Sequence, residues 1–188
     1  MAPTHDTVLA PELTGDYDID ASHSRFGFVA RHAMVTKVRG SFTSFGGTLH
    51  IDADDLSSSR AELSIDVASV DTANEQRDGH LRTNDFFDVE HHPTITFTTT
   101  NIDPKGADHF EVSGDLTIRG VTRPVTIDFE FTGAATDAFG NSRIGFEGST
   151  VVNRKDFGVS WNAPLEAGGV LVSEKVTLEI DISAIKRS

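Results

Sequence analysis

Strict alternation of hydrophobic and polar residues recurs along this chain. It is clearest in four segments, residues 60–67, 110–119, 125–131 and 175–182. A period of two places successive side chains on opposite faces of an extended strand. Each segment therefore predicts a strand with one buried face and one solvated face.

Four further segments show a weaker form of the same pattern: residues 25–31, 37–51, 94–102 and 143–151. In residues 37–51 the hydrophobic phase slips at Thr43-Ser44, which indicates a bulge or bend within a long strand. Turn-forming residues such as Gly, Pro, Asn and Asp separate the segments. The pattern predicts about eight strands joined mostly by short connections.

Residues 71–88 break the alternation. Residues 74–78 are polar and helix-compatible, and Asp71 or Thr72 could cap a helix that begins there. Residues 84–88 suggest a further short helical turn. We therefore expect a helical insertion between two strands.

An all-β chain of this kind must deal with its exposed strand edges. Closure of eight antiparallel strands into a barrel removes the edges and leaves an interior that is either filled or able to hold one slender ligand. A sandwich of two sheets is the alternative. Long strands at residues 37–51 and 175–182 favour a tall barrel. We expect residues 15–188 to form this single barrel domain and residues 1–14, with Pro3 and Pro11, to form a flexible tail.

Composition narrows the class of partner. The 188 residues fit one domain, and 16 Lys and Arg against 29 Asp and Glu give a net charge of 16 − 29 = −13. That net charge repels phosphate backbones and anionic bilayers, so we expect no nucleic acid partner and no stable membrane insertion. The chain contains no cysteine, which excludes a thiol nucleophile, a zinc-thiolate site and disulfides. The N-terminal residues show neither a basic region nor an apolar run, so a cytoplasmic location is expected.

The aromatic residues are strongly biased, with 13 Phe against one Trp and one Tyr. Phe adds apolar area without a polar group, so the interior should be poor in hydrogen bonds. Phe, Leu, Ile and Val occupy the alternate strand positions that would face inward. Parity alone favours a solid core, because most inward faces of strands serve only for packing.

Five stretches, taken in order, are similar to the YceI-like family of polyisoprenoid-binding proteins. They are residues 17–24 leading to Phe28 and His32, residues 84–93 leading to residues 95–97, residues 114–125, residues 153–159 and residues 172–176. The resemblance runs from about Gly15 to the C-terminus. Each stretch is a weak signal by itself, whereas five in the same order are specific.

The resemblance implies an elongated, lipocalin-like barrel with a hydrophobic tunnel. The expected ligand is a long-chain polyisoprenoid or a similar amphiphile, such as an isoprenoid quinone precursor, that the protein carries, stores or sequesters. Family members are often dimers, and many carry a secretory leader, which is not evident here. The side chains expected to line the tunnel are Phe26, Phe28, Phe42, Leu63, Ile65, Leu81, Phe86, Phe87, Ile95, Phe97, Leu116, Ile118, Ile127, Phe129, Phe146, Phe157 and Trp161.

Two features belong to this tunnel interpretation. Leu81, Phe86 and Phe87 of the insertion are expected to close one end as a lid that opens locally. Gly27, Gly114, Gly145 and Gly148, inside strand patterns, mark bends or places where a ligand or backbone approaches closely.

Polar groups at the mouth of a tunnel would contact the head group of the ligand. The candidates are His23, Arg31, His32 and His80. Imidazole and guanidinium groups donate hydrogen bonds to phenol, quinone or phosphate oxygens. The alternative for Arg31 is a solvated surface charge paired with one of the surplus carboxylates, whereas His32 matches a position of the family.

An enzyme acting on a small lipid-like substrate is the main alternative function. Its site would use the His and Asp residues at positions 80–92, namely His80, Asp85, Asp88, His91 and His92. Imidazole and carboxylate groups can bind zinc or iron, but no familiar metal-ligand spacing is present and adjacent strand residues point to opposite faces. We therefore assign no catalytic residue, no metal and no cofactor. A filled barrel that serves as an interaction module is the third possibility.

Overall fold

Eleven strands form one continuous antiparallel sheet in the computed structural model, which describes residues 9–166 and 168–188. The strands are β1 (Gly15–Ile19), β2 (Arg25–His32), β3 (Thr36–Phe42), β4 (Phe45–Ile51), β5 (Arg60–Asp66), β6 (Val70–Asp71), β7 (Thr94–Pro104), β8 (His109–Ile118), β9 (Val121–Thr136), β10 (Ser142–Asn153) and β11 (Lys175–Lys186). One α-helix, α1 (Glu75–Arg82), follows β6. Short 3-10 helices are η1 (Pro11–Leu13), η2 (Ala21–His23), η3 (Leu56–Ser58), η4 (Val67–Ser69) and η5 (Arg154–Phe157).

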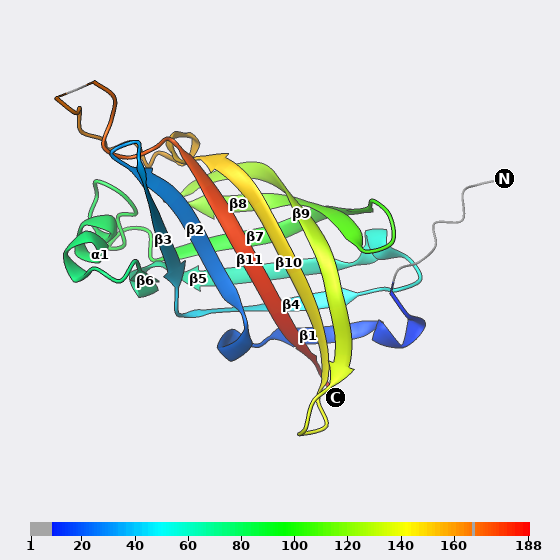
Figure 1. Cartoon of the computed structure of the whole chain (residues 1–188). Helices are drawn as coiled ribbons and strands as arrows, with labels where there is room; N and C mark the ends of the chain where they lie inside the picture. Colours follow the sequence, from blue (N-terminus) through cyan, green and yellow to red (C-terminus); the bar gives the residue numbers. More distant parts are fainter. Residues whose placement is uncertain (1–8, 167) are drawn as a thin grey trace.

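The sheet closes into an eight-stranded barrel because three of the barrel strands are each broken in two. One edge of β11 pairs with β2 from Thr177 to Asp181 and with β1 from Ala184 to Lys186, so β1 and β2 share one position in the wall. β3 and β4 share the next position, since β2 pairs with β3 and β1 pairs with β4. β5 and β6 share the position after that, since β4 pairs with β5 and β3 pairs with β6. Figure 1 shows β2, β11, β10 and β9 crossing in front of the strands of the opposite wall. The closed barrel confirms the predicted fold class, and the sandwich is not formed.

All eight predicted strand segments are present, and the break between β3 and β4 falls at Thr43-Ser44, where the hydrophobic phase slips. β1 was not predicted as a strand. The last strands are longer than predicted, since β9 extends to Thr136 and β11 to Lys186.

The predicted insertion is present as α1 and the turns that follow it. Asn74, not Asp71 or Thr72, caps the helix, because its side chain accepts a hydrogen bond from the backbone N–H of Arg77. The predicted second helical turn at residues 84–88 is wrong, because these residues form turns instead. Their backbone is held from outside the segment by Arg119, whose guanidinium donates a 2.8 Å hydrogen bond to the Phe86 carbonyl.

The chain packs against the barrel from Leu9 onward, which differs from the flexible tail expected over residues 1–14. Leu9 is 3% exposed, and η1 follows it. Tyr17 is fully buried, and its hydroxyl donates a 2.8 Å hydrogen bond to the carbonyl of Leu13. Residues 1–8 lie outside the described part of the chain.

No helix within the described residues has the length and apolar character needed to cross a membrane. The helix α1 has eight residues and a polar composition.

An ion-pair network ties η2 to the β9–β10 hairpin, at the end of the barrel away from α1 (Figure 1). The Arg143 guanidinium lies 2.7 Å from the carboxylate of Asp20 and 2.7 Å from that of Asp137. These hydrogen bonds hold the pKa of both carboxyl groups well below the ordinary value.

Replacement of Arg143 by Gln is expected to weaken the pH dependence of stability on the acid side. Depressed pKa values mean that the unfolded state binds more protons, so the network stabilises the fold above about pH 4 and this contribution is lost as the pH falls further. Thermal unfolding at pH 7 and pH 3 should therefore show a smaller difference for Arg143→Gln than for the wild type. Arg25→Gln is the control, since Arg25 makes a longer and more exposed contact of 3.5 Å with Glu179. If the unfolding temperature changes equally between pH 7 and pH 3 for the wild type and for Arg143→Gln, the network does not contribute to the pH dependence of stability.

Candidate ligand-binding cavity

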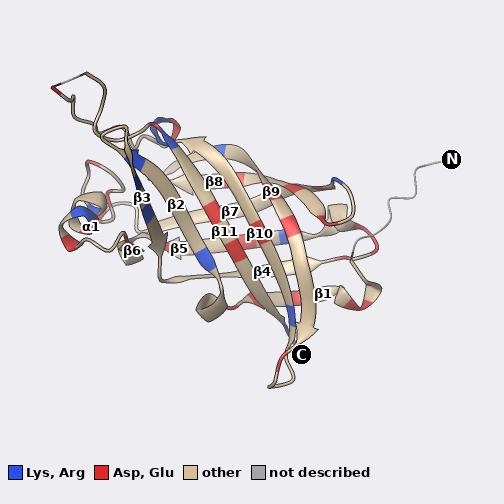
Figure 2. Cartoon of the chain, viewed as in Figure 1, with Lys and Arg blue, Asp and Glu red and all other residues tan. Residues whose placement is uncertain are grey.

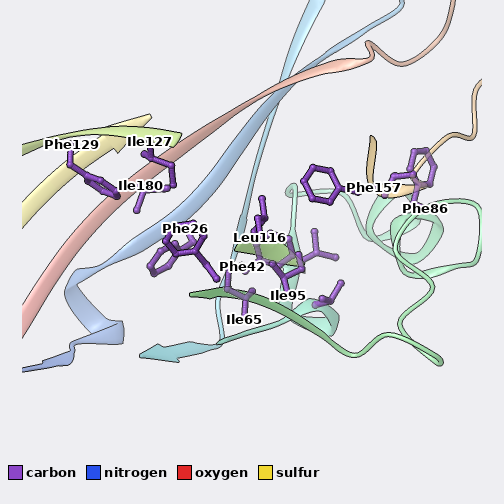
Figure 3. Close-up of a cluster of buried hydrophobic side chains, with 14 residues drawn as sticks. Phe26, Phe42, Ile65, Phe86, Ile95, Leu116, Ile127, Phe129, Phe157 and Ile180 are labelled. Atoms are coloured by element: carbon purple, nitrogen blue, oxygen red, sulfur yellow. The ribbon is translucent and has the colours of Figure 1, made fainter. Parts of the chain in front are cut away.

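An apolar cavity of about 260 Å³ runs inside the barrel. Its wall is built from both clusters of buried side chains in the core. Ile51 and Leu56 line it near the η3 end, and Leu81, Phe86 and Val172 line it near α1. Figure 3 shows part of this lining, with Phe86 and Phe157 toward the helical end and Phe129 and Ile180 on the opposite side. The buried side chains therefore surround a lumen and do not fill it completely.

The predicted tunnel residues occupy this wall. All of them line the cavity except Trp161, which lies in the second cavity described below. The agreement follows from the period-two pattern, because alternate positions on every barrel strand face inward. The agreement shows only where these residues lie. Their role in binding a ligand remains a prediction.

Three Phe rings lie against the wall because the residue beneath each of them is Gly. The ring of Phe28 covers Gly40 of the paired strand, and the ring of Phe97 covers Gly114. A Cβ atom on Gly148 would lie 2.5 Å from the ring of Phe129, which is too close for any real contact. The close approach expected at Gly114 and Gly148 thus comes from aromatic rings, and the rings leave the centre of the lumen free.

A second cavity of about 450 Å³ continues from the first at the α1 end. The residues that line both cavities are Phe28, Ala30, Leu81, Phe86 and Val172. Several residues of the second cavity are exposed to solvent: Arg31, His32, Asn74 and Gln76. We call this second cavity the mouth, because it shares wall residues with the apolar lumen and lies between the lumen and solvent.

Aromatic rings separate the mouth from the lumen. The ring of His80 lies 4.8 Å from that of Trp161 and 5.0 Å from that of Phe86, and both contacts are edge-to-face. The rings of Phe86 and Trp161 are 5.3 Å apart. Phe87, on the lumen side, packs edge-to-face on Phe42 at 5.9 Å. The residues predicted to form a lid therefore do lie at one end of the lumen.

The structure brings three of the four candidate head-group residues together. Arg31, His32 and His80 all line the mouth. His23 lies in η2, away from the mouth, where its ring contacts the Asp20 carboxylate at 2.7 Å and is 65% exposed. Local sequence could not separate His23 from His32, because both flank the same strand.

The His and Asp residues at positions 80–92 do not gather into one site. His80 contacts Asp85 at 2.8 Å beside the mouth, whereas His91 contacts Asp88 at 2.9 Å. The hydrogen bond with Asp88 raises the pKa of His91, whose side chain is 68% exposed. Across the described residues, no group of three or more His, Asp or Glu side chains is arranged to hold a metal ion.

Sequence reasoning missed Arg154, which is a buried charge in the wall of the lumen. It is 7% exposed and lines the lumen. Its guanidinium donates hydrogen bonds to four backbone carbonyls, at 2.8 Å to Ser173, 2.7 Å to Val159, 2.9 Å to Trp161 and 3.3 Å to Val172. Burial lowers the pKa of this guanidinium. Arg154 thereby fixes the segment between η5 and β11 that carries Trp161 and forms one wall of the mouth.

The chain has detectable relatives among known proteins. A family model described as the YceI-like domain matches residues 17–184. The UPF0312 protein SERP2314 of Staphylococcus epidermidis is 39% identical over 164 residues, which cover 87% of this chain and 93% of that protein. BcnA of Burkholderia cenocepacia has a similar structure, with a TM-score of 0.77, 23% identity and coverage of 88% of this chain and 98% of that one. A polyisoprenoid binding domain from Saccharophagus degradans gives a TM-score of 0.69, 18% identity and coverage of 91% and 98%. At these identities, the two structures show a shared fold.

Proposed function

Because this chain belongs to the YceI-like domain family, we propose that it is a lipid-binding protein without catalytic activity. It would carry, store or sequester one long-chain polyisoprenoid, or a similar amphiphile, in the lumen of the barrel. The tail would occupy the apolar cavity, and the head group would lie in the mouth near Arg31, His32 and His80. This role requires no cofactor besides the bound lipid.

The observation that carries the proposal is the apolar lumen inside a closed barrel. Each CH₂ group that leaves water for such an interior gains about 0.8 kcal/mol. A tail of several isoprene units would thus gain more than the several kcal/mol lost through reduced freedom on binding. The name of the Saccharophagus degradans domain, which shares this fold, points to the same class of ligand.

Entry would require local movement of the lid. Phe86 is 6% exposed, lines both cavities and contacts His80 and Trp161. Its segment has turns and no regular hydrogen-bond ladder. Segments of this kind open at a lower free energy than strands in the wall.

The single tryptophan provides a direct test, since Trp161 lines the mouth. Titration with geranylgeraniol should change the fluorescence of Trp161 and saturate at one molecule per chain. The lid variant Phe86→Leu should speed both entry and release by about tenfold in stopped-flow measurements. The smaller side chain makes fewer contacts in the closed lid, and a tenfold change corresponds to a barrier to opening that is lower by about 1.4 kcal/mol.

Phe139→Leu is the matched control, because Phe139 is 90% exposed in the β9–β10 hairpin. It should leave both rates unchanged. Absence of any saturable change with the wild type would contradict the proposed function, and unchanged rates for Phe86→Leu would contradict the lid.

A further inference from the structure

The rim of the mouth carries exposed apolar side chains on two neighbouring loops. Met34 is 61% exposed and Val35 is 76% exposed at the tip of the β2–β3 hairpin. Val170, 38% exposed, belongs to the loop that precedes β11. The backbone N–H of Ala33 donates a 2.7 Å hydrogen bond to the Leu171 carbonyl, which holds the two loops side by side. Figure 1 shows both loops projecting at the same end of the barrel.

Basic side chains lie beside this apolar rim. Arg31 pairs with Lys37 across β2 and β3, and Arg39 follows two residues later on the same face. All three are exposed. Lys37 and Arg39 face outward, because the residue between them, Val38, lines the mouth, and Arg31 lies at the edge of the mouth itself. Figure 2 shows this positive group at the rim end of β2 and β3, with acidic residues farther along β11, β10 and β9.

Within residues 9–166 and 168–188, no carboxylate oxygen lies within 4.0 Å of the side-chain nitrogens of Arg31, Lys37 or Arg39. Like charges directly opposite each other in a sheet destabilise the pair. In a chain with 29 acidic residues, these three cations form a positive patch on a protein whose net charge is negative.

Acidic residues also lie around the mouth, among them Glu75, which is exposed in α1 between the mouth residues Asn74 and Gln76. Glu174 contacts Lys155 at 2.8 Å, so its charge is already compensated. Glu166 is exposed in the loop that precedes β11. The exposed outer face of β2 and β3 at the rim is therefore positive.

We propose that the rim docks reversibly on the surface of an anionic lipid bilayer, with the mouth facing the membrane. Met34, Val35 and Val170 would enter the boundary between head groups and acyl chains, and Arg31, Lys37 and Arg39 would contact the lipid phosphates. The negative net charge assists the orientation, because the acidic remainder of the barrel is repelled from the same surface. This inference builds on the proposed function, since a bilayer is the reservoir from which a long-chain lipid enters the mouth or to which it returns.

Vesicle flotation tests the docking with the full chain. Binding to phosphatidylcholine vesicles that contain phosphatidylglycerol should exceed binding to pure phosphatidylcholine vesicles and should fall as salt is added. The double variant Lys37→Gln/Arg39→Gln, which leaves the lining of the mouth intact, should weaken this binding about thirtyfold, at roughly 1 kcal/mol per cation. The double variant Met34→Ser/Val35→Ser should weaken it about tenfold, because it removes exposed apolar area.

Matched controls lie elsewhere on the barrel. Lys105→Gln removes an exposed cation that contacts Asp103, and Phe139→Ser removes an exposed apolar side chain from the β9–β10 hairpin. Both controls should bind vesicles like the wild type. Equal binding to neutral and anionic vesicles, or equal losses for the rim variants and the controls, would overturn the docking. Geranylgeraniol titration of the same samples separates the docking from the proposed lipid-binding function. If the protein takes up geranylgeraniol but does not bind vesicles, the docking alone is refuted.

Discussion

Replacement of Ala30 by Trp is expected to reduce lipid uptake by a few hundredfold. Ala30 lies in β2 and lines both the lumen and the mouth, so an indole at this position fills the passage between them. If the indole displaces four or five methylene groups of the tail, the loss is about 3–4 kcal/mol at 0.8 kcal/mol each. Isothermal titration calorimetry with geranylgeraniol measures the effect without interference from the added fluorophore.

The control for this variant is Ala135→Trp, on β9. Ala135 is exposed and pairs with Arg143 on β10, away from the mouth. It should bind geranylgeraniol with the affinity of the wild type. If Ala30→Trp also binds with that affinity, the ligand does not pass through or occupy the junction of the two cavities, and the assignment of the mouth is wrong.

Replacement of Arg154 by Met is expected to destabilise the protein by about 3 kcal/mol or more. The substitution leaves four carbonyls, those of Ser173, Val159, Trp161 and Val172, without the guanidinium that they share. A buried acceptor that loses its partner costs about 1–3 kcal/mol, although water can satisfy part of this set. Urea unfolding at neutral pH gives the change in free energy directly.

Two further variants make this result specific. Arg154→Lys should recover little stability, because an ammonium group cannot span four carbonyls. Arg123→Met is the exposed control, since Arg123 donates a single hydrogen bond of 3.2 Å to the Asp156 carbonyl, and its change should stay within about 0.5 kcal/mol. A midpoint for Arg154→Met equal to that of the wild type would show that Arg154 does not hold the wall of the mouth.

Most of the barrel could be predicted from the sequence because the side chains of a strand alternate with a period of two. This pattern located the wall strands and the break at Thr43-Ser44, and nearly all of the tunnel residues that it predicted do line the lumen. β1 was missed although Tyr17 and Ile19 alternate with acidic residues, because the segment is only five residues long. Short strands give too few repeats for the pattern to be distinctive.

Features that depend on contacts between distant segments could not be predicted in the same way. Trp161 follows η5 and lines the mouth, where Arg154 donates a hydrogen bond to its carbonyl. The cap at Asn74 was misplaced because Asp71 and Thr72 are equally good caps by residue type. In the folded chain the Asp78 carboxylate instead accepts a 2.9 Å hydrogen bond from the backbone N–H of Thr72.

The net charge of −13 also gave an incomplete picture of the surface. It indicated repulsion from anionic bilayers, yet the register of β2 and β3 places Arg31, Lys37 and Arg39 on one exposed face beside the mouth. The net charge is a sum over all residues, so it does not show where on the surface the charges lie. The distribution of charge is what decides how the molecule is oriented near a charged surface.

The central claim is that the lumen holds one long-chain lipid. Native mass spectrometry of the freshly purified protein, with analysis of an organic extract of the same sample, tests it most directly. We predict a single isoprenoid or similar amphiphile at one per chain, released on denaturation. A chain that is isolated without lipid and takes up no geranylgeraniol at any concentration below its solubility would contradict the claim, and the barrel would then be a packed scaffold.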